Sequence, residues 1–205
     1  MRLGIFGGSF DPVHYGHLLV AETCCQQRKL DRVVFVPAAV PPHKQQWQLT
    51  SARQRLEMLE LAIAGNERFE VSTIEVERGG VSYSVDTLSA LAEEHPQATL
   101  FFLMGADSLC DLPTWREPQR LCQLAIPLVA CRADTPEPDL STLARLVDED
   151  RLGEIRRHQV TMPIVEFSST DLRRRVAAGE SIRYRTPRAV QKYIETHGLY
   201  RQQES

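Results

Sequence analysis

The chain has 205 residues, of which 42% are hydrophobic and 25% charged, a composition that excludes fibrous and disordered proteins. A net charge of −3 and a pI near 6.1 argue against general nucleic-acid binding, so an anionic ligand would need a local basic site. The length fits a single domain, and we expect its C-terminal portion, from about residue 168, to be helical.

The five cysteines are odd in number and show no C-x-x-C spacing, so neither a disulfide framework nor a zinc site is predicted. The N-terminus runs directly into a strand-like sequence, and no stretch reaches the roughly eighteen apolar residues of a membrane span. We therefore expect a cytoplasmic protein that binds neither nucleic acid nor membrane. The sequence leaves a homo-oligomer open.

Short apolar runs typical of buried strands alternate along the chain with helical patterns. The predicted strands cover residues 3–6, 32–36, 69–76, 99–104, 125–131 and 164–167. The predicted helices cover 17–28, 53–64, 84–94, a region around 140–147, and a last helix that Thr186 would cap and Gly198 would end. This alternation predicts an α/β fold, a doubly wound, Rossmann-like parallel sheet with helices on both faces.

The most informative segment is Gly4–His17, which joins a strand to a glycine turn and two histidines. Gly7 and Gly8 end the strand where side chains would keep a ligand away from the backbone. His14 and His17 are three residues apart, so a helix beginning near His14 places both imidazoles on one face of its first turn. The unpaired N–H groups of that turn favour an anion. The alternative is that the histidines only pack at the helix start.

In a doubly wound sheet, ligands bind beyond the carboxyl ends of the strands, near the point where the strand order reverses. Three loops follow predicted strands in this way, namely residues 7–8, 37–44 and 105–108. We expect these loops to line one crevice, although they are distant in sequence.

The sequence His14-Tyr15-Gly16-His17, after a glycine turn, resembles the H-x-G-H signature of the nucleotidyltransferase superfamily. The resemblance implies that the two histidines hold the phosphates of ATP and that the glycines let the chain approach the nucleotide closely. The ATP-binding residues implied in this segment are Gly7, Gly8, Ser9, Phe10 and Gly16.

Pro41-Pro42-His43-Lys44 is a stiffened loop that would present Lys44 to phosphates, whereas on its own it would be interpreted as an exposed turn with a solvated lysine. Together with H-x-G-H, it resembles the nicotinate-mononucleotide adenylyltransferase branch, which makes nicotinate adenine dinucleotide in NAD synthesis. Arg55–Leu61 resembles the R-x-x-M-L-x-L helix of that branch, and we expect it to supply mainly core contacts.

Ser82–Leu88 resembles the S-Y-T-x-x-T-L segment of the same branch, which implies contacts with the pyridine mononucleotide, although Ser82 or Ser84 as a simple helix cap is the alternative. Trp115 would stack on the pyridine ring, whereas an isolated tryptophan is more often a core residue. The implied acceptor-binding residues are Ser82, Tyr83, Ser84, Thr87, Trp115 and Arg116.

Two further segments complete the resemblance. Gly105 and Asp107 follow the fourth strand, and the resemblance implies that Asp107 binds a ribose hydroxyl, unless it only caps a short helix. Phe167–Arg173 resembles the I-S-S-T-x-I-R segment, in which small hydroxyl residues begin a helix and an arginine binds phosphate one turn later. The residues concerned are Ser168, Ser169, Thr170 and Arg173, and the alternative is a serine-capped helix with solvated arginines.

The resemblance implies adenylyl transfer from ATP, accompanied by Mg²⁺, to nicotinate mononucleotide, with no resident metal site. We expect alignment and charge stabilisation by His14, His17, Lys44 and Arg173, without a covalent intermediate. Three competing interpretations remain: a pantetheine-phosphate adenylyltransferase, a nicotinamide-specific enzyme, and a non-catalytic nucleotide-binding regulator.

Overall fold

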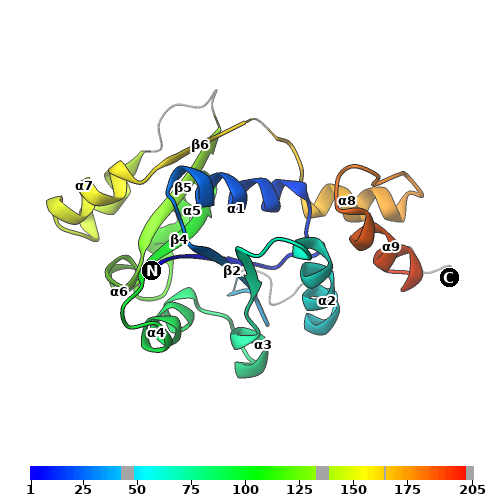
Figure 1. Ribbon diagram of the computed structural model, residues 1–205, viewed down its shortest axis with the longest axis horizontal. Coiled ribbons are helices and arrows are strands. Elements are labelled where there is room, and N and C mark those ends of the chain that lie inside the picture. Colours follow the sequence, from blue (N-terminus) through cyan, green and yellow to red (C-terminus); the bar gives the residue numbers. More distant parts are fainter. Residues whose placement is uncertain (43–48, 133–138, 164, 202–205) are drawn as a thin grey trace.

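The computed structural model describes residues 1–42, 49–132, 139–163 and 165–201, and it contains a six-stranded parallel sheet (Figure 1). The strands are β1 (Arg2–Gly8), β2 (Arg32–Pro37), β3 (Phe69–Val71), β4 (Thr99–Gly105), β5 (Ile126–Arg132) and β6 (Val160–Met162). Their order is β3-β2-β1-β4-β5-β6, and every neighbouring pair is parallel. The predicted doubly wound α/β fold is confirmed, and the strand order reverses between β1 and β4.

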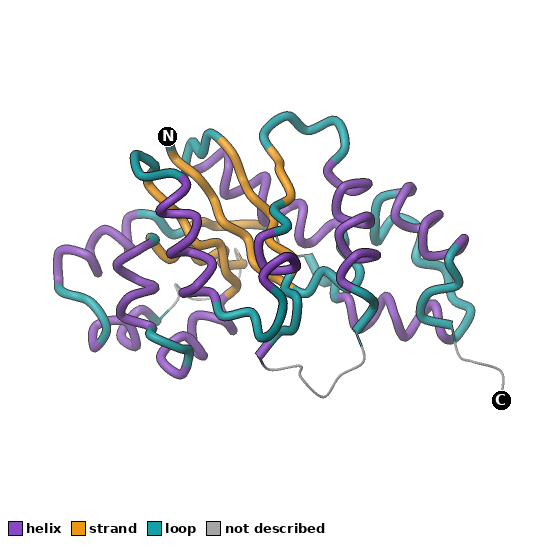
Figure 2. Tube along the Cα trace, turned by 90° about the horizontal axis from the view of Figure 1, so that it is seen from below, coloured by secondary structure: helices purple, strands orange, loops and turns teal. Residues whose placement is uncertain are grey.

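Helices cover both faces of this sheet, with α1 on one face and α3 and α4 on the other (Figure 1). The α-helices are α1 (Tyr15–Gln27), α2 (Ala52–Ile63), α3 (Ile74–Arg78), α4 (Ser84–Glu94), α5 (Ala106–Asp111), α6 (Pro118–Leu124), α7 (Glu149–Arg157), α8 (Ser169–Ala177) and α9 (Arg188–Thr196). Two 3₁₀-helices cover Leu112–Thr114 and Leu140–Arg145. Figure 1 and Figure 2 show α8 and α9 at one end of the molecule. Among the helices described, none is long and apolar enough to cross a bilayer.

The core lies along the central strands, whose apolar residues are buried on both faces of the sheet because helices cover each side. Leu3 and Ile5 of β1, Phe35 of β2 and Phe101 of β4 are each at most 1% exposed. This rigid centre fixes the carboxyl ends of β1, β2 and β4, and thus the loops that follow them.

The predicted strand 69–76 is wrong beyond Val71, where the chain turns into the short helix α3. The strand-like run of this segment predicted an extended strand. Instead the backbone N–H of Glu77 donates to the carbonyl of Thr73, and Gly79 ends the helix with a φ of 67°. Glycine adopts such a positive φ without the steric cost of a Cβ atom, so the Gly79-Gly80 pair was the local signal for this ending.

Three other boundaries also differ from the predictions. The sixth strand is Val160–Met162, and residues 165–167 of the predicted strand form a loop that leads into α8. The region around 140–147 contains a short 3₁₀-helix, capped by Asp139, in place of a full α-helix. The last helix begins after Pro187, because the Thr186 hydroxyl donates to the carbonyl of Val13 and does not cap the helix.

Candidate active site

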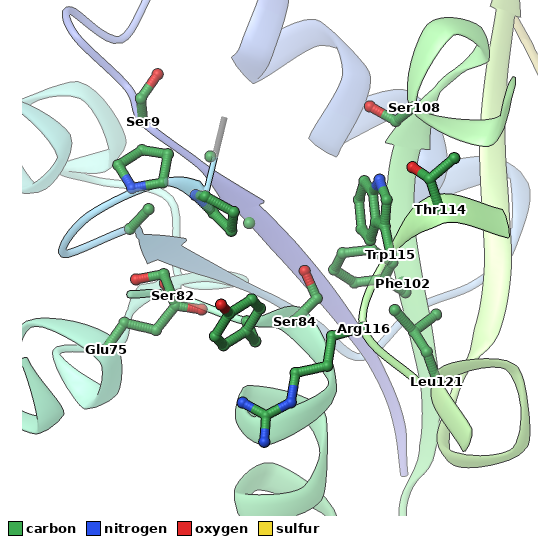
Figure 3. A pocket seen from close by; sticks show the side chains of 16 residues that line it. Ser9, Glu75, Ser82, Ser84, Phe102, Ser108, Thr114, Trp115, Arg116 and Leu121 are labelled. Atoms are coloured by element: carbon green, nitrogen blue, oxygen red, sulfur yellow. The ribbon is translucent and has the colours of Figure 1, made fainter. Parts of the chain in front are cut away.

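The loops that follow the central strands meet around a cavity of about 370 Å³. Its lining comes from the end of β1, the loop after β2, the starts of α4 and α5, and the segment around residue 115 (Figure 3). Each of the three loops expected to share a crevice contributes described residues to this lining. The residues are Gly7, Gly8, Ser9, Ala38, Pro41, Pro42, Glu75, Ser82, Tyr83, Ser84, Phe102, Ser108, Thr114, Trp115, Arg116 and Leu121.

Trp115 forms one side of the cavity together with Phe102, and Ser82 and Glu75 lie on the opposite side (Figure 3). The ring centroids of Trp115 and Phe102 are 6.1 Å apart in an edge-to-face arrangement, which fixes the orientation of the indole. Trp115 is only partly buried, so it is not purely a core residue. Its position allows stacking with a flat ligand.

Arg116 lines the cavity and its side chain contacts the start of α4. Its guanidinium carbon lies 4.7 Å from the centre of the Tyr83 ring, and its Nη1 is 3.5 Å from a carboxylate oxygen of Asp86. The Arg116 guanidinium therefore interacts with two residues at the start of α4.

His14 and His17 adopt the geometry that their spacing predicts. His14 is the N-cap of α1, and its backbone N–H donates to Nδ1 of His17 at 3.2 Å. Because Nδ1 accepts this bond, the neutral His17 ring carries its proton on Nε2, which is therefore a hydrogen-bond donor. The two imidazoles stack with their centroids 3.7 Å apart.

Burial distinguishes His14 from an ordinary histidine. The residue is 5% exposed, and this desolvation lowers the pKa of the His14 imidazole from 6.5 to about 4, with a small opposing effect of a backbone hydrogen bond. His14 is therefore neutral at pH 7. Within the part of the chain that the structure describes, its buried Nδ1 has no hydrogen-bond partner, a feature that is rare in native proteins.

Gly16 is required by the close approach of the His14 ring. A Cβ atom at this position would lie 3.0 Å from both Cε1 and Nδ1 of His14, closer than nearly all real Cβ contacts. The glycine in H-x-G-H thus lets the first imidazole fold back over the start of α1. Gly8 is similar, because a Cβ atom there would lie 3.0 Å from the Phe10 ring.

The segment at the start of α8 contacts the histidine motif directly. Arg173 donates from Nη1 to the carbonyl of Asp11 at 2.6 Å, and the Ser169 hydroxyl donates to the carbonyl of Pro12 at 2.9 Å. Ser168 accepts from the backbone N–H of Asp171 and so caps the helix, as the alternative interpretation proposed. Thr170 is exposed and accepts a hydrogen bond from Arg173.

Other predicted residues lie apart from the cavity lining. Thr87 is 3% exposed and hydrogen-bonded within the protein, and Phe10 is a core residue at 1% exposure. Gly105 and Asp107 are exposed at the end of β4, and Asp107 lies in the first turn of α5 without capping it. Lys44 lies outside the described residues.

Two buried charged residues lie beside the site: Glu75, which sequence reasoning missed, and Arg55, which was expected only as part of a helix that supplies core contacts. Glu75 lines the cavity at 5% exposure, and Arg55, 1% exposed, donates to three backbone carbonyls. Arg55 donates from Nη1 to Ser9 at 2.9 Å, from Nη2 to Ala39 at 3.2 Å and from Nε to Thr50 at 3.0 Å. It therefore connects three segments around the cavity, a role that its position in an apolar helix pattern did not reveal.

A resident metal ion would need a cluster of suitable side chains. Excluding the gaps at 43–48, 133–138, 164 and 202–205, no group of three or more histidine, cysteine, aspartate or glutamate residues is arranged to hold one.

Comparisons with known proteins agree with this geometry. The cytidylyltransferase-like family model matches residues 5–175. A relative from Thermomicrobium roseum, named a probable nicotinate-nucleotide adenylyltransferase, is 48% identical over 100% of this chain and 94% of its own. A relative of the same name from Thermus thermophilus is 45% identical over 98% of this chain and 100% of its own.

The fold is also that of a solved Plasmodium falciparum nicotinic acid mononucleotide adenylyltransferase, complexed with NaAD, with a TM-score of 0.75. The sequence of that protein is 21% identical to this chain, and the structural alignment covers 97% of each of the two chains. From the family match and the two relatives, which align along nearly their whole length, the chain belongs to the cytidylyltransferase-like family and, within it, to the nicotinate-nucleotide adenylyltransferases.

Proposed function

We propose that this site transfers the adenylyl group of ATP to nicotinate mononucleotide, giving nicotinate adenine dinucleotide and pyrophosphate, with the 370 Å³ cavity as the acceptor site. One observation carries this assignment. The cavity has Trp115 on one side, the start of α4 on another, and the glycine turn that leads to H-x-G-H at its end. A flat, anionic acceptor would thus lie beside the phosphate-binding motif.

The acceptor side combines an aromatic surface with a helix N-terminus. Trp115 offers its face to the pyridine ring, an interaction available to any flat aromatic group. Tyr83 and Ser84 line the cavity at the start of the eleven-residue helix α4, whose first N–H groups carry partial positive charge. This positive end favours the carboxylate of nicotinate over the neutral amide of nicotinamide.

The phosphate side combines neutral donors with a cation. We assign Nε2 of His17 and the guanidinium of Arg173 to the phosphates of ATP, with the start of α1 as an additional donor surface. Lys44 and the ribose contact of Asp107 remain predictions. Mg²⁺ would enter with ATP as part of the substrate, bound to phosphate oxygens and water, and would neutralise negative charge there.

The reaction itself needs little from the protein beyond alignment. An oxygen of the mononucleotide phosphate attacks the α-phosphorus of ATP, and the bond from that phosphorus to the β-phosphate bridging oxygen breaks with its electron pair leaving on pyrophosphate. Because a phosphate monoester is already anionic near neutral pH, no general base is required. Hydrogen bonds and positive charge then stabilise the transition state.

The test is to supply the purified chain with ATP, Mg²⁺ and one acceptor, and to follow pyrophosphate release. We expect release with nicotinate mononucleotide and much slower release with nicotinamide mononucleotide or phosphopantetheine. Faster release with one of the other acceptors would overturn the acceptor assignment. Absence of release with all three would identify a nucleotide-binding protein without this activity.

A further inference from the structure

Glu75 is a buried carboxylate on the cavity wall that the phosphate-transfer roles above do not use. It lies in α3, is 5% exposed, and faces Ser82 on the side of the cavity opposite Trp115 (Figure 3). Burial raises the pKa of its carboxyl, and hydrogen bonds from Thr87 and Ser82 and the charges of Arg78 and Arg55 oppose that rise. The buried carboxylate is thus surrounded by hydrogen-bond donors and positive charges that stabilise its ionised form.

The carboxylate holds two hydroxyl groups that flank the start of α4. Thr87 donates from its hydroxyl to Oε1 of Glu75 at 2.5 Å, and the Ser82 hydroxyl makes a second hydrogen bond with the carboxylate. Thr87 lies one helical turn after Tyr83, the N-cap of α4. Glu75 thus fixes the first turn of this helix from both ends.

The same contacts extend to the loop after β2. Oγ of Ser82 accepts a hydrogen bond from the backbone N–H of Ala39 at 2.8 Å, and the Ser82 N–H donates to the carbonyl of Val40 at 2.9 Å. Arg78 donates to the Thr87 hydroxyl at 3.1 Å. Ser82 therefore joins the loop after β2 to the start of α4, and the Glu75 carboxylate contacts this junction at Ser82 and the first turn of α4 at Thr87.

We propose that Glu75 is a positioning residue for the acceptor nucleotide, which fixes Ser82 and the first turn of α4 so that their polar groups face the ligand. This inference rests on the proposed function. Glu75 acts through other groups and takes no part in the transfer of the adenylyl group. Its loss should weaken binding of the mononucleotide and leave the use of ATP nearly unchanged.

The experiment measures kcat and both KM values for wild type, Glu75→Ala, Glu75→Gln and Glu77→Ala. Glu77 is the matched control, because it lies on the same helix, is exposed, and also accepts from a threonine hydroxyl, Thr73, at 2.5 Å. We expect Glu75→Ala to raise KM for nicotinate mononucleotide at least about tenfold, with KM for ATP and kcat within about threefold of wild type. Glu75→Gln should recover part of the loss, and Glu77→Ala should resemble wild type.

A double-mutant cycle with Thr87→Val separates positioning from general support of the fold. If Glu75 acts through Thr87, the effects on KM of Glu75→Gln and Thr87→Val are not additive. Unchanged KM for the mononucleotide in both single variants, or an equal loss for both substrates together with a lower Tm, overturns the proposal. Wild-type activity with nicotinate mononucleotide is measured first, so failure of the proposed function is recognised separately. If Glu75→Ala does not fold, the Gln and Val variants decide.

Discussion

The backbone N–H of His14 donates to Nδ1 of His17, and this one bond makes the two histidines of the motif chemically different. It assigns the proton of the neutral His17 ring to Nε2, which becomes a directed donor. His14 remains a buried neutral ring stacked against it. The two imidazoles of the motif therefore differ in their hydrogen-bonding capacity.

His17→Ala removes this donor and should lower kcat by at least about a hundredfold, the size of effect seen when a transition-state hydrogen bond is lost. Pyrophosphate release at saturating substrates measures it. His95→Ala is the control, because His95 lies at the end of α4, outside the cavity lining. Near-normal turnover of His17→Ala would contradict the assigned role.

The buried His14 should make stability depend on pH. Its folded pKa of about 4 lies below the unfolded value of 6.5, so the unfolded chain binds the proton first as the pH falls. The contribution of the neutral His14 ring to the free energy of unfolding is fully present above pH 6.5. It decreases as the pH falls toward 4, by on the order of 3 kcal/mol. Urea unfolding at pH 7 and pH 4.5 should show a smaller loss for His14→Gln than for wild type. Equal losses would show that His14 is not the titrating group.

Gly16→Ala should place a methyl group against the His14 ring, at 3.0 Å, and displace it. We expect roughly a tenfold loss of kcat, because small misplacements of binding groups are costly. The matched control is Gly153→Ala in α7, where no atom lies within 4 Å of the new Cβ. That change should leave activity intact and stabilise the protein by about 0.5–1 kcal/mol. Activity of Gly16→Ala equal to that of Gly153→Ala would contradict the steric argument.

Trp115→Ala should raise KM for the mononucleotide about tenfold or more, because stacking on an aromatic side chain contributes about 1–3 kcal/mol per base. KM for ATP should stay unchanged. Trp115→Phe keeps an aromatic face, and the buried indole Nε1 has no partner among the described residues, so this variant should lose much less. Steady-state kinetics with each substrate varied in turn measures both. Equal losses in the two variants would exclude stacking as the main contribution.

Arg55→Met should lower the free energy of unfolding by about 3 kcal/mol, because three partly buried carbonyls lose the charged donor that the buried Arg55 provides. The control is Arg53→Met on the same helix, whose side chain is 88% exposed and pairs only with Glu57 in the contacts described. Urea unfolding followed by circular dichroism compares the two. A similar small effect of both substitutions would show that the three hydrogen bonds contribute little.

Local patterns predicted much of this architecture. The apolar runs of β1, β2 and β4 and the alternation with helices gave the sheet type, because burial on both faces leaves a continuous hydrophobic signature. The spacing of His14 and His17 predicted that a helix beginning near His14 would place both imidazoles on one face, and α1 begins at Tyr15 with the two rings stacked. These features depend on residues close together in the chain.

The features that were missed depend on contacts across the fold. Glu75 falls within the run 69–76 that predicted a strand, whereas it lies in α3 and accepts a hydrogen bond from Thr87, twelve residues away. Arg55 reads as one charge in an apolar helix pattern, and its partners Ser9 and Ala39 are far along the chain. No local pattern encodes such partners.

The hydrogen bonds from Ser169, Arg173 and Thr186 to residues 11–13, with that from Tyr200 to Asp11, have a consequence for synthesis of the protein. During synthesis, the ribosome adds residues 11–17 early and adds the residues that hydrogen-bond to residues 11–13 last. At about 5–20 residues per second, roughly ten to forty seconds separate the two on the ribosome. The segment 11–13 beside the two histidines thus completes its hydrogen bonds among the last parts of the molecule to assemble, although it is among the first segments made.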